Sequence, residues 1–324
     1  MVKAIPVIDL GPYLAGENGA LARKAAQLGE ASATLGFFFI GNHGVPQSLV
    51  DRVFAETERF HALPLDEKMK VKMVSRALIG YLPLGGQTQR TSIYGTSTHP
   101  DRSTSFYMKE EFAPDHPDRL TKKPWVFDNL WPESLPGFRA TLLEYFAAMD
   151  RLGRQLLPLQ SVALGLPADY LTKHEAFRPP SSTLRLLMYP PRDPSLDGQF
   201  GIGPHTDYGH MTILAQAKQP GLEILDDGEW IQAPALDGHF LINNGDMFRH
   251  WANDRVRSTP HRVIVSGRET RYSIPYFFGT RPDVRLECLP TCHDAANPPR
   301  YAPKSFGEFI GEINRQNIDL PAAE

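Results

Sequence analysis

The sequence predicts a β-sandwich or jelly roll that is preceded by a largely helical N-terminal half. From about Ser182 onward, short apolar runs are bounded by Gly, Pro, Asp or Asn, as is typical of the strands of such domains. These runs span residues 183–189, 211–214, 222–225, 240–243, 262–265 and 272–277. Before Ser182, apolar residues recur at helical spacing instead. No repeat, linker or low-complexity tract divides the chain.

Several elements are expected before the β core, each marked by its periodicity and by the residues that bound it. In chain order they are a strand at 5–10, a helix at 19–35, a strand at 37–40 with a turn at 41–46, a helix at 46–63 and a long helix at 136–164. Gly36 is placed to cap the first helix, and Pro64 to stop the second. Pro158 is expected to kink the long helix, which Gly165 ends.

Two further segments complete the prediction of the fold. Residues 75–135 are dense in Gly, Pro, Ser and Thr and predict irregular structure, with short strands near 104–109. The tail from Ser305 to Asn317 has the pattern of a closing helix. We therefore expect one domain over residues 1–324, with a mainly helical or irregular part at 1–181, a β core at 182–304 and a C-terminal helix within 305–324.

Composition limits the classes of function. The chain has 324 residues, 41% hydrophobic and 22% charged, and a formal net charge of −3. This balance excludes wholesale disorder and gives no electrostatic footprint for nucleic acid. No run approaches the ~20 apolar residues of a membrane span, and residues 1–6 lack a signal-peptide pattern. Cys288 and Cys292 fit no common zinc motif and are interpreted as free thiols in a reducing compartment. We expect a cytoplasmic protein with a small-molecule partner.

A candidate metal site lies in Pro204-His205-Thr206-Asp207, at the mouth of a predicted strand. In a strand, residues two apart face the same side, so His205 and Asp207 can meet one metal. A third ligand is expected from His261, just before another strand. Two histidines and one carboxylate on one side of a metal leave three positions open, which iron(II) oxygenases use for O₂ and organic ligands.

A second group of residues fits an organic anion. Arg271 and Ser273 are two residues apart, so both lie on one face of a predicted strand. The guanidinium fork of Arg271 matches a carboxylate, and the Ser273 hydroxyl adds a donor. Tyr189 closes another predicted strand, where its phenol can reach the same carboxylate. The apolar neighbours of Arg271 indicate partial burial, and a buried Arg needs an anion.

Taken together and in this order, these stretches resemble the isopenicillin N synthase-like branch of the 2-oxoglutarate/iron(II)-dependent oxygenases, across nearly the whole chain. The matching stretches are Ile5 to Leu10, Gly36 to Val45, Arg185 to Pro190, Pro204 to Gly209, Asn243 to Asp246, Arg255 to Val263 and Arg271 to Ser273. Leu187 and Met188 depart from the resemblance, because the family commonly has an Asn and a further Tyr there. One polar contact to cosubstrate or substrate is therefore in doubt.

The resemblance implies a double-stranded β-helix (jelly roll) fold and a single oxygenase domain. It implies iron(II) on His205, Asp207 and His261, and 2-oxoglutarate on Arg271, Ser273 and Tyr189. The implied enzyme is a non-haem dioxygenase that uses O₂ to hydroxylate or desaturate a small organic molecule, with succinate and CO₂ as coproducts. The resemblance carries no prediction of the oligomeric state.

Substrate contacts are expected from aromatic and Arg side chains in the irregular region 78–110 and near the ends of predicted strands, since loops on a rigid scaffold carry specificity. The candidates are Tyr81, Arg90, Tyr94, Arg102, Phe106, Phe248, Arg249 and Phe277. Their chemistry favours a small substrate that is partly apolar and anionic.

Three other functions are compatible with the same residues. Some members of this family bind iron and O₂ without 2-oxoglutarate, and the Arg-x-Ser pair then holds a substrate carboxylate. Two His and an Asp also suit a zinc hydrolase, although no Glu that could act as a general base adjoins either ligand segment. The third alternative is a non-catalytic jelly-roll binding module, which has no need of a complete ligand and anchor set.

Overall fold

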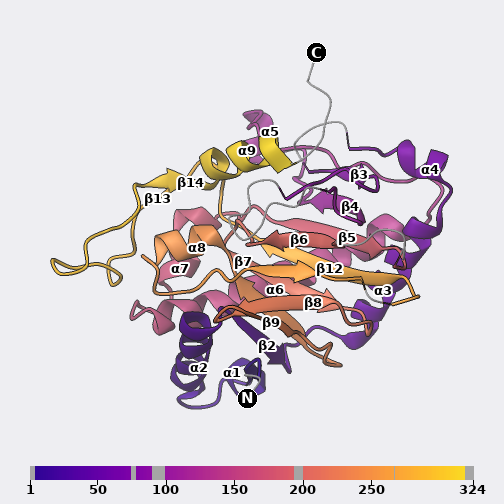
Figure 1. Cartoon of the computed structure of the whole chain (residues 1–324). Helices are drawn as coiled ribbons and strands as arrows, with labels where there is room; N and C mark the ends of the chain where they lie inside the picture. Colours follow the sequence, from indigo (N-terminus) through magenta and orange to yellow (C-terminus); the bar gives the residue numbers. More distant parts are fainter. Residues whose placement is uncertain (1–3, 74–77, 90–98, 193–199, 266, 318–324) are drawn as a thin grey trace.

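The computed structural model describes residues 4–73, 78–89, 99–192, 200–265 and 267–317, which form two packed sheets with helices on one side (Figure 1). The large sheet contains, in spatial order, β1 (Val7–Asp9), β2 (Phe37–Gly41), β10 (Phe240–Asn244), β7 (Met211–Gln216), β12 (Arg271–Phe278), β5 (Thr183–Tyr189), β4 (Thr104–Lys109) and β3 (Gly80–Leu82). The small sheet contains β6 (Ile202–His205), β11 (His261–Val263), β8 (Leu222–Asp226) and β9 (Glu229–Gln232). β13 (Arg285–Leu286) pairs with β14 (Lys304–Ser305).

Helices are interspersed with these strands along the chain. They are α1 (Gly11–Leu14), α2 (Ala20–Thr34), α3 (Gln47–Ala62), α4 (Leu65–Met69), α5 (Pro117–Leu120), α6 (Phe138–Ala163), α7 (Tyr170–Lys173), α8 (Asp246–Trp251) and α9 (Phe306–Asn317), with a 3₁₀ turn at Glu175–Phe177. Within the described residues, no helix has the length and apolarity that crossing a bilayer requires.

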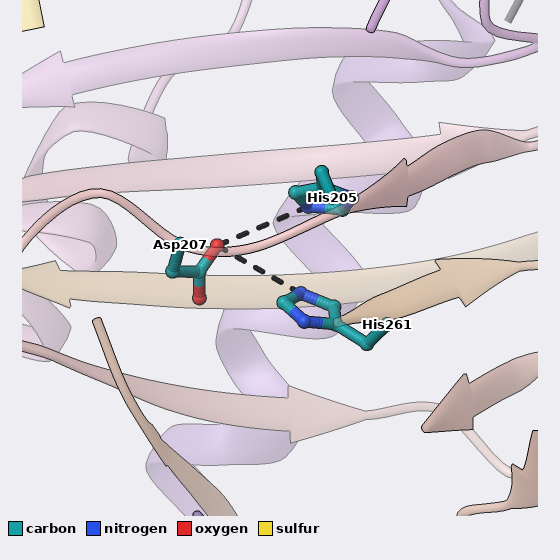
Figure 2. Close-up of side chains that lie close together, drawn as sticks. All are labelled: His205, Asp207 and His261. Carbon is teal, nitrogen blue, oxygen red and sulfur yellow. Dashed lines mark ion pairs between the residues drawn. The ribbon is translucent and has the colours of Figure 1, made fainter. Parts of the chain in front are cut away.

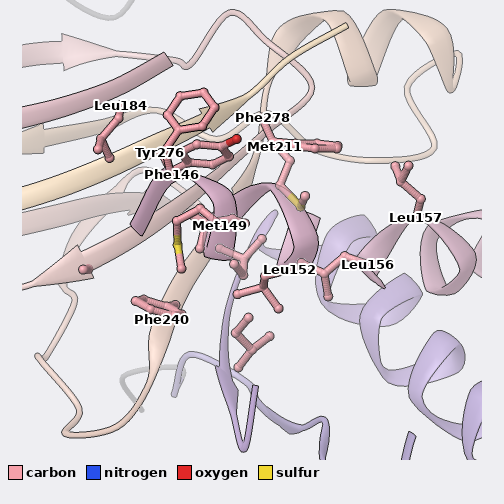
Figure 3. Close-up of a cluster of buried hydrophobic side chains, with 14 of the residues drawn as sticks. Phe146, Met149, Leu152, Leu156, Leu157, Leu184, Met211, Phe240, Tyr276 and Phe278 are labelled. Carbon is pink, nitrogen blue, oxygen red and sulfur yellow. The ribbon is translucent and has the colours of Figure 1, made fainter. Parts of the chain in front are cut away.

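Side-chain alternation along the strands of the large sheet divides the core in two. On one face, Leu184, Tyr276 and Phe278 pack against α6, which supplies Phe146, Met149 and Leu152 (Figure 3). The opposite face looks toward the small sheet. Its residues in the second core are Phe37, Phe39, Leu187, Tyr189, Leu214 and Leu241, and the small sheet contributes Ile202, Leu222, Ile224 and Val263. The space between the two sheets is therefore the interior of the jelly roll, and residues that face it can form a site.

The predicted jelly roll is confirmed, as are the predicted strands and long helices. α2 ends before Gly36, whose φ of 74° is the left-handed value that a C-cap glycine adopts. α6 continues through Pro158 to Ala163. Cys288 and Cys292 are free thiols.

The prediction was wrong for several short elements. α8 at residues 246–251, β9, α4, α5 and α7 were not predicted. Elements of four to six residues contain too few turns for periodicity to mark them.

His61 makes the stability of the folded protein depend on pH. Its side chain is 5% exposed, and its Nε2 lies 3.2 Å from the carbonyl oxygen of Leu186. Burial lowers the pKa of His61 from 6.5 to about 3. The imidazole is therefore neutral in the folded state but binds a proton in the unfolded state below pH 6.5. The contribution of the neutral His61 imidazole to the free energy of unfolding is complete above pH 6.5 and is lost as the pH falls toward 3.

The variant His61→Gln, which keeps an N–H donor for the Leu186 carbonyl, tests this dependence. Between pH 6 and pH 5, we expect the free energy of unfolding of the wild type to fall by about 1 kcal/mol more than that of the variant. Urea denaturation of both proteins at the two pH values measures the difference. Equal pH slopes would show that His61 is protonated in the folded state.

Candidate metal centre

His205 and His261 are brought together by strand pairing in the small sheet. His205 is the last residue of β6, His261 is the first of β11, and the two are direct antiparallel partners. Their ring centroids lie 4.3 Å apart. His261 is 8% exposed, and His205 is partly buried. Two residues 56 positions apart in the chain thus present their imidazoles at one point of the jelly-roll rim.

Backbone carbonyls orient both rings. Nδ1 of His205 lies 2.8 Å from the carbonyl oxygen of Gly203, and Nδ1 of His261 lies 3.2 Å from that of Thr259. A carbonyl only accepts, so each Nδ1 carries the proton and each Nε2 keeps a free lone pair. Burial, followed by the neighbouring His261, lowers the pKa of His205 to about 3, which keeps that imidazole neutral and able to bind a metal.

Asp207 completes the group with one carboxylate oxygen. Its Oδ2 accepts hydrogen bonds from Asn243 Nδ2 at 2.7 Å and from the Thr212 hydroxyl. Oδ1 lies 3.9 Å from Nε2 of His205 and 3.8 Å from Nε2 of His261 (Figure 2). Burial raises the pKa of Asp207, but the two histidines and the two hydrogen bonds outweigh burial, and the pKa is lowered overall. Oδ1 is therefore the oxygen available to a metal.

The expected convergence of His205 and Asp207 is confirmed, but the reason given for it was wrong. β6 ends at His205, so Asp207 lies beyond the strand and strand alternation does not place it. Its position is set by the segment that precedes α8. The backbone N–H of Asp246 donates to the carbonyl of Asp207 at 2.8 Å, and that of Gly245 to the carbonyl of His210 at 3.0 Å.

Gly245 permits this close approach. A Cβ at position 245 would lie 2.2 Å from the carbonyl oxygen of Gly209, a distance that real Cβ atoms do not adopt. At Gly209, across the same contact, a Cβ would meet no atom within 4 Å. The pair therefore offers a substitution that must displace the segment carrying Asp207 and a matched one that need not.

We expect Gly245→Ala to weaken iron(II) binding by roughly 10–100-fold, the loss typical when the support of a metal ligand is disturbed. Gly209→Ala is expected to change it by less than about twofold. Anaerobic iron(II) titration of the two variants and the wild type measures the effect. Equal affinities in all three proteins would mean that this backbone contact does not position Asp207.

The three donor atoms fit a divalent ion. The candidate ligand atoms of His205, Asp207 and His261 all lie within 4.8 Å of one another. Ligands at neighbouring positions of an ion, each at about 2.1 Å, lie roughly 3 Å apart, so binding would draw the side chains together by about 1 Å. Two imidazoles and one carboxylate on one side of an ion suit iron(II) and leave the other side open.

A buried guanidinium lies deeper in the same interior. Arg271 is 3% exposed, its Nε donates to the carbonyl of Gln219 at 3.3 Å, and its Nη1 has no hydrogen-bond partner. Among the described residues, no carboxylate lies within 4.0 Å of it. Burial lowers the pKa of Arg271. A buried cation without a counter-ion is costly, so this arrangement favours an anionic ligand.

Ser273 and Tyr189 stand beside Arg271, as predicted. Arg271 and Tyr189 are direct partners of β12 and β5, and the guanidinium carbon lies 4.9 Å from the centre of the Tyr189 ring. The Tyr189 hydroxyl and Ser273 Oγ are 3.3 Å apart. Both hydroxyls can donate to the anion that Arg271 attracts.

Strand register gives the spacing between the anion anchor and the metal ligands. Ser273 pairs with Gln216 on β7, and Thr212, which binds Asp207, lies four residues away on that strand. Four strand residues span about 13 Å. Side chains reach into this interval from both ends, so the remaining space is on the scale of a five-carbon diacid.

The structure places the candidate substrate residues in different surroundings. Tyr81, Phe106 and Phe248 belong to the core between the helices and the large sheet, so their prediction as substrate contacts is not supported. They are large and apolar, and the core between sheet and helices takes them up. Arg90 and Tyr94 lie outside the described residues.

The remaining candidates are less buried than those in the core. Phe277 is half-buried and pairs with Thr212, so it faces the interior at the level of Asp207. Arg102 donates to the carbonyl of Pro191 at 3.2 Å. Arg249 lies on α8, 3.7 Å from Asp254. Phe277 is therefore the candidate that the structure brings to the metal centre.

Sequence reasoning missed the residues that support the ligands. Asn243 and Thr212 hold Asp207, and Arg185 and Asp101 lie buried in the interior. For Asn243, a signal was present in the sequence, because the polar pair Asn243-Asn244 ends an otherwise apolar predicted strand. Asp101 lies in a stretch without periodicity, where no pattern marks it.

Comparisons with known proteins agree with this geometry. The family model described as non-haem dioxygenase in morphine synthesis N-terminal matches residues 5–134, and that of the 2OG-Fe(II) oxygenase superfamily matches residues 180–280. The 2-oxoglutarate-Fe(II) type oxidoreductase hxnY of Emericella nidulans is 34% identical over 326 residues, covering 97% of this chain and 90% of that protein.

Solved structures show the same fold. A full-length protein of Neurospora crassa, crystallised in complex with alpha-KG (2-oxoglutarate), has a TM-score of 0.83 at 27% identity, covering 96% of this chain and 95% of that chain. The complex of the same Neurospora protein with alpha-KG and thymine has a TM-score of 0.82 at 26% identity, with 96% of each chain covered.

The chain belongs to the 2-oxoglutarate- and iron(II)-dependent oxygenases. The resemblance seen in the sequence is thereby confirmed, together with the jelly-roll fold. The protein is a non-haem iron enzyme, and its cofactor and cosubstrates are iron(II), 2-oxoglutarate and O₂.

Proposed function

We propose that His205, Asp207 and His261 hold iron(II), and that Arg271, Ser273 and Tyr189 hold the distal carboxylate of 2-oxoglutarate. The enzyme then hydroxylates or desaturates a small organic molecule, with succinate and CO₂ as coproducts. One observation carries this proposal above the others. The candidate metal-ligand triad and a buried guanidinium, which has no carboxylate in ion-pair range among the described residues, face one interior and are four strand residues, or about 13 Å, apart along the strands.

Bound iron would supply the redox chemistry: O₂ and 2-oxoglutarate would be converted to succinate and CO₂, and the remaining oxygen atom would either enter the substrate or leave as water with two hydrogen atoms taken from the substrate. The chain itself orients the reactants. The carbonyls of Gly203 and Thr259 keep both Nε2 atoms turned to the metal position, while Asn243 and Thr212 leave one Asp207 oxygen for it. The Arg271 fork fixes the direction in which a dicarboxylate lies.

The interior also restricts water. Leu187, Leu214 and Ile224, all buried, line the core that joins the anion anchor to the metal ligands. Water exclusion strengthens the electrostatic contacts of Arg271 and limits side reactions of oxidising species. Leu187, which stands where the family commonly has an Asn, contributes to this apolar wall and removes one polar contact.

The substrate is proposed to be small, partly apolar and anionic. Phe277 at the level of Asp207 supplies an apolar surface for it. The Neurospora crassa protein, whose structure contains thymine, shows that a relative of similar fold takes a molecule of this size. One domain over the whole chain, a cytoplasmic location and the absence of a nucleic-acid or membrane partner are proposed with it, on the basis of composition.

A substrate screen that measures succinate tests the proposal. Purified enzyme with iron(II), 2-oxoglutarate and O₂ is incubated with amino acids, nucleobases, phenolics and terpenoid acids. We expect succinate above the substrate-free level with at least one class, and oxygen uptake that requires 2-oxoglutarate. Oxygen uptake without 2-oxoglutarate would support the iron oxidase alternative instead.

A zinc hydrolase and a non-catalytic binding module are the two remaining alternatives. Among the described residues, His205, Asp207 and His261 form the only metal-ligand cluster, and no Glu belongs to it. A hydrolytic zinc site needs such a base beside the ion. Metal analysis after anaerobic loading separates these alternatives, because full activity with zinc alone, or no turnover with any metal, would contradict the proposed oxygenase.

A further inference from the structure

A second buried guanidinium faces the jelly-roll interior. Arg185 on β5 is 6% exposed, although its neighbours along the strand are apolar. Its Nε donates to Ser105 Oγ at 2.9 Å and its Nη2 to Gln87 Oε1 at 3.1 Å. The guanidinium carbon lies 4.8 Å from the centre of the Tyr107 ring. All three contacts are with neutral groups, so none of them compensates the buried charge.

The positive charge of Arg185 has no ion-pair partner. Across the part of the chain that the structure describes, no carboxylate lies within 4.0 Å of its nitrogens. Nη1 forms no hydrogen bond with the described residues. The free edge of the guanidinium therefore offers one N–H from Nη1 and one from Nη2, which is the fork that binds a carboxylate with two parallel hydrogen bonds.

Register separates Arg185 from the 2-oxoglutarate anchor. Arg185 faces the same interior as Leu187 and Tyr189, which are two and four residues further along β5. Tyr189 pairs with Arg271, so the two guanidinium-bearing positions are about 13 Å apart along the strands. Arg185 therefore occupies its own position along the strands, apart from the proposed 2-oxoglutarate anchor.

Asp101 is a buried carboxyl group that contacts β6, the strand that ends at His205, and interacts electrostatically with Arg185. It is 2% exposed, and its Oδ1 accepts a hydrogen bond at 2.9 Å from the backbone N–H of Gly203, two residues before His205. Its Oδ2 forms no hydrogen bond with the residues that the structure describes. Burial raises the pKa of Asp101 to about 7, and Arg185 is close enough to oppose that rise. A protonated Asp101 can donate a hydrogen bond through Oδ2.

We propose that Arg185, with Asp101 beside it, binds a carboxylate of the primary substrate, so that the enzyme acts on small organic acids. This inference rests on the proposed function and names its substrate class. With an uncharged substrate, no carboxylate among the described residues would form an ion pair with Arg185, whereas a substrate carboxylate can pair with it and fill both free N–H positions. Phe277, at the level of Asp207, then contacts the apolar part of the acid.

Matched pairs of ligands test the proposal on the anaerobic enzyme loaded with iron(II) and 2-oxoglutarate. Benzoate, phenylacetate and 3-phenylpropionate are each compared with their primary amides by calorimetry. In the wild type, we expect at least one acid to bind about 10-fold or more tightly than its amide. We expect Arg185→Gln to lower the affinity for that acid by roughly 30-fold or more and to remove the preference for the acid over its amide.

Two further variants make the result specific. Arg185→Lys keeps the charge but loses the planar fork, and it is expected to lower the affinity for the acid by about 3–10-fold. This variant also serves as the test if the Tm of Arg185→Gln shows that it does not fold. Arg59→Gln, an exposed residue of α3 that pairs with Glu56, is the control and is expected to change neither affinity.

The proposal is overturned if no acid binds more tightly than its amide in the wild type, or if the preference survives in Arg185→Gln. Succinate formation by the same preparation separates this inference from the proposed function. If the enzyme forms succinate but binds no acid more tightly than its amide, only the role of Arg185 is contradicted. If the enzyme prefers an acid but forms no succinate that depends on 2-oxoglutarate, the proposed oxygenase chemistry is contradicted and the acid site remains.

Discussion

Replacing Asp207 with alanine is expected to abolish iron(II) binding at micromolar metal and to lower succinate formation by at least about 1,000-fold. In the proposed metal centre, Asp207 supplies the anionic ligand beside two imidazoles. Its loss also leaves the buried donors of Asn243 and Thr212 without their acceptor. Iron content after anaerobic loading and the initial rate of succinate formation measure the two effects.

Two controls separate ligand loss from general damage. Asn243→Ala keeps the ligand and removes one of its supports, so a loss of roughly 10–100-fold in iron affinity is expected, clearly smaller than that of Asp207→Ala. Asp237→Ala, at an exposed position before β10, should leave both quantities unchanged. Normal iron content in Asp207→Ala would remove this residue from the metal centre.

Replacing Arg271 with lysine is expected to raise the KM for 2-oxoglutarate well beyond the ~10-fold that ~1.4 kcal/mol would produce. Lysine keeps the charge but loses the planar fork, and its ammonium is more strongly hydrated than a guanidinium in the same buried position. Steady-state succinate formation at varied 2-oxoglutarate measures the change. Iron(II) affinity, measured without 2-oxoglutarate, is expected to stay within about twofold of the wild type.

Arg139→Lys is the matched control, because Arg139 is exposed and pairs with Glu111 far along the chain from β12. It should leave the KM for 2-oxoglutarate unaltered. An unchanged KM in Arg271→Lys would contradict the assigned anchor. A raised KM for the substrate with no effect of 2-oxoglutarate would instead match the oxidase alternative, in which this pair holds a substrate carboxylate.

The anion group could be predicted from sequence because its geometry is carried by strand periodicity, whereas the geometry of the metal group depends on the fold. Arg271 and Ser273 lie on one face of β12 as alternation requires, and Tyr189 is their cross-strand neighbour. The partnership of His205 with His261 depends on the pairing of β6 and β11, which no local pattern contains. The place of His261 before a predicted strand made it a candidate, and the resemblance to the family supported that choice.

The parts that could not be predicted depend on which face of an element meets which layer. Alternation places Phe106 and Tyr107 on opposite faces of β4, but it does not tell which face meets the helices. The structure puts Phe106 in the helix-side core and Tyr107 beside Arg185. Arg185 itself stands within an apolar run, where a single charged residue gives no sign of facing inward.

The position of Asp207 also required the fold. The segment after β6 is held by backbone hydrogen bonds from Gly245 and Asp246, almost forty residues later in the chain. Such a contact needs a glycine at 245 because a Cβ would collide with Gly209. The spacing of His205 and Asp207 predicted that the two side chains meet, but the reason for their convergence is tertiary.

The most direct test of the central claim is anomalous diffraction at the iron K-edge from crystals loaded anaerobically with iron(II). The expected result is a single strong anomalous peak within about 2.3 Å of Nε2 of His205, Nε2 of His261 and Oδ1 of Asp207. A peak at another position, or none beside these three atoms in crystals that contain iron, would contradict the account.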